Sequence, residues 1–146
     1  MEVILGNSSA TQEFMEQVND LDYIIAPVGG GGLISGTALA AYYFSPKTKV
    51  IGAEPKLADD AFRSIESGEI QPPLPPLTIA DGLRTALGDI TFPLIQQFVQ
   101  EIKLASEDEI IAAMKLIWER MKIIVEPSSA ITLAIVLKNK SYFKGK

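Results

Sequence analysis

Three short apolar runs alternate along this chain with stretches of helical spacing. Asp22–Val28, Lys49–Ala53 and Ile102–Ala105 contain β-branched residues, and each run predicts a buried strand. Between the first two runs lie Gly29–Gly32 and Leu33–Phe44, an Ala- and Leu-rich stretch that predicts a helix ending at a Ser-Pro pair. A strand, a glycine loop, a helix and a second strand make up the unit from which parallel sheets with right-handed crossovers are built.

Five further helices are predicted by apolar spacing and by local start and stop signals. A capping box, Ser106-Glu107-Asp108-Glu109, begins one of them, and Gly68 ends another. Four prolines in Gln71–Pro76 remove backbone donors, so an extended surface segment is expected there, and Thr78–Gly88 is left unassigned. The expected helices are Ser8–Asp20, capped by Ser8 or Ser9, then Ala58–Ser67, Phe92–Val99, Ser106–Met121 and Glu126–Leu137.

These elements predict an α/β fold with a parallel sheet and flanking helices, in a single domain that spans residues 1–146. Only three strands are expected, and a parallel sheet must be covered on both faces. Three strands make a narrow sheet for helices to cover on both faces. We therefore expect an incomplete domain whose sheet is short of a strand after Leu137.

The composition narrows the classes of function. The chain is 47% hydrophobic and 21% charged, its net charge is −5, and its basic residues are scattered, which argues against a nucleic-acid or anionic-membrane partner. Cysteine and histidine are absent, which excludes disulfides, Ser-His-Asp triads and Cys/His zinc sites and leaves oxygen ligands, suited to magnesium or calcium, for any metal. With no apolar span of roughly 20 residues and no signal-like start, a cytoplasmic location is expected.

The glycine run is the strongest local signal. Gly29–Gly32 lies between a strand and a helix start, where glycines let the backbone approach a ligand and free amides face a small anion. A tight turn usually takes one or two glycines, so four favour an anion site, with phosphate the expected anion. Gly30-x-Gly32-x-x-Ser35 matches the dinucleotide-binding fingerprint loosely, and Glu54 lies about where a ribose-binding acid would be. A non-enzymatic phosphate or dinucleotide-binding module therefore stays open as an alternative.

A second candidate segment, Glu54 to Asp60, contains several charged residues. It follows the second strand at its carboxyl end, where open α/β sheets place their sites. Two carboxylates with a backbone carbonyl between them suit a hard cation. Acids here also favour the dipole of the following helix, and from composition alone that simpler interpretation is preferred.

Four motifs in order resemble one enzyme family, the serine racemases and threonine dehydratases, which are pyridoxal-phosphate enzymes of the tryptophan synthase β type. The likeness covers about residues 20 to 137, and the order and spacing of the motifs make it specific. The motifs are Ala26–Gly36 (APVGGGGLISG), Ala53–Asp60 (AEPKLADD), Ile79–Leu83 (IADGL), and Trp118–Lys122 (WERMK) leading to Val125–Ser128 (VEPS).

The resemblance assigns roles to particular residues. It implies a large domain that binds pyridoxal phosphate and acts on small hydroxyamino acids, with Gly82 and Glu126 beside the cofactor ring. It also implies a cation site for magnesium or calcium, and Lys122 near a site for ATP as effector at a dimer interface. The cofactor phosphate would be held by backbone amides of Gly29, Gly30, Gly31, Gly32 and Leu33, and the cation by the carboxylates of Glu54 and Asp60 with the carbonyl of Ala58.

The chain departs from the family pattern in the residues that perform the chemistry. No segment matches the Ser-x-Lys motif of the Schiff-base lysine, and Ser45-Pro46-Lys47 follows a large-domain helix and is rejected. The small lysine-bearing domain, the racemase's opposing serine and the Ser-Gly-Gly-Asn strand are also unmatched. We expect a large-domain fragment that is inactive alone, and that forms a homo-oligomer or pairs with a complementing N-terminal half.

Overall fold

Three strands form the parallel sheet that the apolar runs predict, in the order β1-β2-β3. The computed structural model describes residues 1–75 and 77–146. Ile25 of β1 lies opposite Ile51 of β2, and Gly52 of β2 lies opposite Ile102 of β3. The strands are β1 (Tyr23–Pro27), β2 (Lys49–Pro55) and β3 (Glu101–Ala105).

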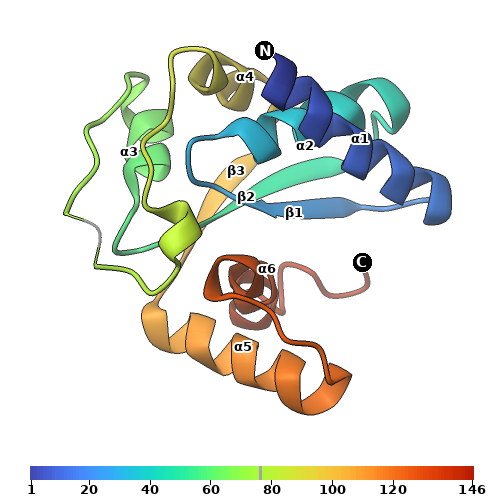
Figure 1. Ribbon diagram of the computed structural model, residues 1–146. Helices are drawn as coiled ribbons and strands as arrows, with labels where there is room; N and C mark the ends of the chain where they lie inside the picture. The colour runs from blue at the N-terminus through green and yellow to red at the C-terminus, as the bar shows by residue number, and fades with distance from the viewer. Residues whose placement is uncertain (76) are drawn as a thin grey trace.

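Helices cover both faces of this sheet, as a parallel sheet requires (Figure 1). Helices α1, α2 and α4 lie on one face, and α5 and α6 form a pair on the other. The predicted α/β class is therefore confirmed. The helices are α1 (Glu2–Gln17), α2 (Gly32–Phe44), α3 (Asp60–Ser67), α4 (Thr91–Phe98), α5 (Glu107–Met121) and α6 (Pro127–Lys138), with a 3-10 turn at Asp81–Leu83.

Each face has its own apolar core. On the α2 side, Val28 and Ile34 pack around Gly52, where a Cβ would lie 2.8 Å from the Val28 side chain, so this glycine lets helix and sheet approach closely. On the α6 side, Ile110 and Ile131 are fully buried against the sheet. The two cores fix α2 and α6 against opposite faces of the same strands.

Helix α1 differs from the expected Ser8–Asp20. It begins at Glu2, and the hydroxyls of Ser8 and Ser9 do not cap it but donate to carbonyls three residues earlier. Tertiary packing is the cause, because a Cβ on Gly36 of α2 would lie only 2.5 Å from the Ile4 carbonyl oxygen. That close crossing buries Ile4 and keeps the first turns helical despite poor local propensity.

Helix α3 begins at Asp60 rather than Ala58, because its first free amides are capped from β2. The Glu54 carboxylate accepts hydrogen bonds from the Ala61 and Phe62 amides at 2.9 and 2.8 Å. Residues 71–75 form neither helix nor strand and are mostly exposed, in agreement with the predicted surface segment, and Pro76 lies outside the described residues. No helix in the described ranges is both long enough and apolar enough to cross a membrane.

Candidate functional site

The glycine loop joins β1 to α2 at the carboxyl end of the strand. Gly31 is the N-cap residue of α2 and has φ of +84°, a left-handed conformation that favours glycine. The amides of Gly29, Gly30 and Gly31 find no acceptor in the described part of the chain. Gly32 and Leu33 open the helix, where amides have no intrahelical acceptor. The loop therefore presents a run of free donors.

These donors face a cavity of about 280 Å³ that also receives the start of α6. Glu126 is the N-cap residue of α6, with Pro127 in its first turn. Two helix N-termini, those of α2 and α6, thus meet at one cavity, and both dipoles favour an anion there. The cavity is lined by Pro27, Gly29, Gly30, Gly31, Gly32, Leu33, Gly82, Leu83, Glu126, Ser128 and Ser129.

The structure brings all seven residues of the expected cofactor site into the lining of this one cavity. Gly82 reaches it because the turn at Asp81–Leu83 is tied to α6: the Gly82 amide donates to the Ser128 hydroxyl at 3.1 Å. A Cβ on Gly82 would lie 3.0 Å from that hydroxyl and 3.8 Å from a Glu126 carboxylate oxygen. A larger residue would press on the Ser128 hydroxyl, so Gly82 helps to leave this side of the cavity open.

Sequence reasoning missed Ser128 as a site residue. It follows the Glu-Pro pair in the motif, but no local pattern connects it with Gly82, which lies 46 positions earlier. Ser35, the third position of the loose fingerprint, was named in the sequence analysis but does not line the cavity. Its fully buried hydroxyl has no partner in the described chain.

The three expected cation ligands lie around the start of α3 but do not form one open site. Ala58 and Asp60 line a separate cavity of about 340 Å³ beside the proline segment. Asp60 accepts from the Leu87 amide at 3.2 Å, while Glu54 lies beneath α3 with its carboxylate turned to that helix. No group of three or more acidic side chains that could hold a metal occurs within the described ranges.

Burial dominates the electrostatics of this acidic pair. Glu54 is 1% exposed, and desolvation raises its pKa to about 8 although the Phe62 and Ala61 amides act in the opposite direction. Desolvation likewise raises the pKa of Asp60. The same burial removes Glu54 from consideration as a ribose-binding acid, because both of its oxygens already accept amides of α3.

Lys122 lies apart from both cavities. It is the C-cap residue of α5, with φ of +60°, and it is exposed, as are Ile123 and Ile124 after it. Lys122 lines neither cavity, so the structure does not bring it together with the other predicted site residues.

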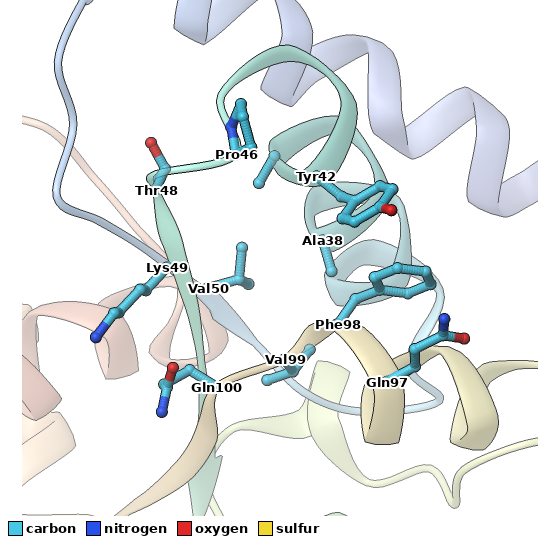
Figure 2. A pocket seen from close by; sticks show the side chains of 11 residues that line it. Ala38, Tyr42, Pro46, Thr48, Lys49, Val50, Gln97, Phe98, Val99 and Gln100 are labelled. Atoms are coloured by element: carbon cyan, nitrogen blue, oxygen red, sulfur yellow. The ribbon is translucent and has the colours of Figure 1, made fainter.

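The largest cavity that we describe, about 440 Å³, lies at the opposite end of the strands (Figure 2). The end of α2, the start of β2 and the end of α4 enclose it, and the rings of Tyr42 and Phe98 lie 5.0 Å apart on one side. None of the predicted site residues lines it. The glycine-loop cavity, and not the largest one, therefore combines free donors with convergent polar groups.

Comparison with known proteins places this arrangement in a family. The family model described as "Pyridoxal-phosphate dependent enzyme" matches residues 1–146. The chain is 56% identical to a serine racemase of Dictyostelium discoideum, over all of this chain and 45% of that protein. It is 49% identical to the β-hydroxyaspartate dehydratase of Paracoccus denitrificans, over 99% of this chain and 46% of that protein.

Solved structures agree with this assignment. The crystal structure of the Dictyostelium serine racemase matches with a TM-score of 0.90 at 55% identity, over 97% of this chain and 45% of that one. The crystal structure of a T.th. threonine deaminase matches with a TM-score of 0.91 at 42% identity, over 94% of this chain and 53% of that one. The chain spans about half the length of the relatives it matches, and it belongs to the pyridoxal-phosphate dependent enzymes.

Proposed function

We propose that this chain is the cofactor-binding part of the large domain of an enzyme that dehydrates or racemises small hydroxyamino acids. The observation that carries the proposal is the convergence of seven motif residues, from three separate segments, on one cavity between two helix N-termini. The names of relatives support the substrate class, since they include serine racemases, a β-hydroxyaspartate dehydratase and threonine deaminases.

The residues of the cavity fit a phosphorylated planar cofactor. The free amides of Gly29–Leu33 are donors for a phosphate, and the positive ends of α2 and α6 add to the attraction. Gly82 leaves room for a flat ring beside Glu126 because a larger residue would meet the Ser128 hydroxyl. Pyridoxal phosphate, when bound, would supply an electron sink for charge that develops at the substrate Cα.

We propose that this chain alone holds and orients the cofactor but does not complete the reaction. The segments that it contributes carry no lysine in the cavity lining, and covalent catalysis needs such a nucleophile. The complete protein would obtain the lysine from a complementing N-terminal half or domain. We further propose a divalent cation, magnesium or calcium, at Glu54, Ala58 and Asp60, and ATP as an effector near Lys122.

The dinucleotide alternative is less well supported. It needs Glu54 to reach a ribose hydroxyl, but that carboxylate is buried and occupied by the amides of α3.

Binding measurements test the proposal directly. The 146-residue chain should bind pyridoxal phosphate, followed by absorbance or fluorescence, more tightly than NAD. Gly82→Ala should weaken this binding by about tenfold or more, because the added Cβ meets the Ser128 hydroxyl, yet leave the affinity for inorganic phosphate unchanged. Gly6→Ala, whose Cβ would have no neighbour within 4 Å, is the matched control. Tight NAD binding with no response to pyridoxal phosphate would overturn the proposal.

Activity measurements test the division of labour. The purified chain incubated with pyridoxal phosphate and serine or threonine should release no pyruvate or 2-oxobutanoate above a control without protein. Adding a separately made N-terminal half should restore release. Turnover by the chain alone would show that it carries its own nucleophile, contrary to the proposal.

A further inference from the structure

The back of the glycine loop is packed against a segment far away in the sequence. A Cβ on Gly29 would lie 2.9 Å from the Thr85 hydroxyl oxygen, and one on Gly31 would lie 2.7 Å from the Thr91 Cβ. Neither threonine lines the cavity, so both lie on the side of the loop that faces away from it. The glycines therefore admit a supporting segment behind the loop as well as a ligand in front.

Of these two contacts, only that of Thr91 includes hydrogen bonds. The Thr91 hydroxyl donates to the Gly30 carbonyl at 2.9 Å, with the Gly88 carbonyl as a second acceptor at 3.1 Å, and it accepts from the Gly88 amide at 3.0 Å. Thr91 is buried, at 9% exposure, in the first turn of α4. The hydroxyl is thus also held by Gly88, in the turn that precedes α4. Thr85, by contrast, makes no hydrogen bond within the described residues through its hydroxyl.

Peptide geometry links this bond to the cavity. The Gly30–Gly31 peptide is trans, so the Gly30 carbonyl and the Gly31 amide N–H point in opposite directions from one rigid plane. Because Thr91 holds the carbonyl on the far side of the loop, the Gly31 N–H must point away from Thr91, towards the side on which Gly31 lines the cavity.

We propose that Thr91 is a positioning residue for the phosphate site, which fixes the direction of the Gly31 N–H through the Gly30 carbonyl. This inference rests on the proposed function, since it concerns the anion that the same cavity takes. Gly31 needs such a restraint because glycines on both sides leave the peptide free to rotate. A loop whose amides already point at the ligand does not have to be ordered when the ligand binds.

Replacement of the hydroxyl, with the shape preserved, isolates this role. Thr91→Val removes the bond to Gly30, Thr91→Ser keeps it, and Thr85→Val is a matched control that changes a threonine behind the same loop without removing a hydrogen bond. We expect Thr91→Val to weaken inorganic phosphate and pyridoxal phosphate by roughly tenfold, the scale of one hydrogen bond. Thr91→Ser and Thr85→Val should bind within about twofold of the unmodified chain.

A spectroscopic readout separates positioning from general destabilisation. Titration with inorganic phosphate should shift the Gly31 amide resonance in ¹H–¹⁵N spectra of the unmodified chain, of Thr91→Ser and of Thr85→Val. In Thr91→Val this shift should shrink, and the ¹³C resonance of the Gly30 carbonyl should move without any ligand. Melting temperatures measured without ligand show whether each variant is folded.

The outcomes distinguish the two proposals. If the unmodified chain binds both probes and a folded Thr91→Val variant binds them equally, with the same Gly31 shift, the role of Thr91 is wrong while the proposed function stands. If Thr91→Ser loses affinity as Thr91→Val does, shape and not the hydroxyl matters, and the inference is also overturned. If the unmodified chain binds neither probe, the proposed function fails, and a positioning role for Thr91 fails with it.

Discussion

Glu54 has the most demanding environment of any single residue in this chain. A carboxylate at 1% exposure costs free energy unless donors or a cation satisfy it. Two amides of α3 do so in part, but Asp60 lies near enough to add repulsion, and no cationic side chain contacts Glu54 within the described chain. Each carboxylate oxygen keeps a further lone pair for a metal. A divalent cation shared by Glu54, Asp60 and the Ala58 carbonyl would relieve this repulsion, and binding it would require these three groups to close into the single site that they do not form here.

A metal-dependent melting experiment tests that site. A cation that binds only the folded chain stabilises it by about 2.7 kcal/mol at a concentration one hundred times its Kd. The melting temperature should therefore rise with magnesium or calcium, and Glu54→Gln and Asp60→Asn should each remove most of the rise.

Asp59→Asn is the matched control for those variants. Asp59 is adjacent to Asp60 and pairs with Arg63 at 2.8 Å, but it is not among the proposed ligands, so this variant should keep the metal response. A full response in both Glu54→Gln and Asp60→Asn would place the cation elsewhere.

At the scale of elements, the start of α5 is a charged cap that also joins α5 to α6. The Ser106 hydroxyl accepts from the Glu109 amide, and the Glu109 carboxylate accepts from the Ser106 amide at 2.7 Å and from Lys138 of α6 at 3.1 Å. Burial raises the pKa of Glu109, but the Ser106 amide and the Lys138 ammonium outweigh it, so the pKa lies below its ordinary value of 4.5. The ionised form of Glu109 is therefore the one that stabilises the fold.

The sign of the pH dependence follows from that lowered pKa. Because the pKa in the folded state is below that in the unfolded state, the contribution of Glu109 is complete above the unfolded value of 4.5 and is lost as pH falls through the folded value. Glu109→Gln keeps an acceptor for the Ser106 amide but cannot ionise. The unmodified chain should be the more stable by a constant amount, on the order of 0.5 kcal/mol for so exposed a pair, above about pH 5.5. This excess should shrink below pH 4.5 in urea titrations.

Glu119→Gln provides the comparison for that series. Glu119 is an exposed residue of the same helix, and its side chain makes no hydrogen bond within the described residues. This variant removes one carboxylate of α5 without removing a bond of the cap, so it shows how much of any change belongs to the loss of a charge alone. A pH-independent difference between Glu109→Gln and the unmodified chain would contradict the prediction for the capping carboxylate.

At the scale of the whole molecule, the sheet has open edges. Strand β2 pairs on both sides, but β1 and β3 each pair with β2 alone among the described strands. Unpaired amides and carbonyls at an edge are a template for another chain. Tyr142 and Phe143 pack with their rings 5.5 Å from the ring of Tyr23, at the start of β1, but Tyr142 also lies against Lys103 of β3, so these rings cross a face of the sheet instead of pairing with its edge.

Association is therefore expected. Light scattering across a range of protein concentrations should give a mass above that of one chain, because a second copy or the complementing N-terminal half relieves the exposed edge. Addition of the N-terminal half should replace self-association by a mixed complex. A single-chain mass at high concentration would contradict this expectation. It would indicate that the segment from Lys138 to Lys146 covers the sheet edge well enough to prevent association.

The sequence by itself determined the class of fold and the order of its parts. Short apolar runs with β-branched residues predicted three strands, because residue type and run length are local properties, and the structure confirms all three. The capping box at Ser106 and the helix end at Gly68 were predictable for the same reason, since each depends on residues within one turn of helix. The ordered motifs also sufficed to indicate the family, which the comparisons confirm.

Only the tertiary structure decided which distant segments of the chain contact one another. The start of α1 depends on a close crossing at Gly36, and the shape of the cavity depends on the bond between Gly82 and Ser128. Likewise, the orientation of Glu54 and the bond from Thr91 to the glycine loop join segments whose local patterns carry no trace of the contact. Local propensity reflects interactions over a few residues, whereas these features arise from packing between elements that the chain brings together only on folding.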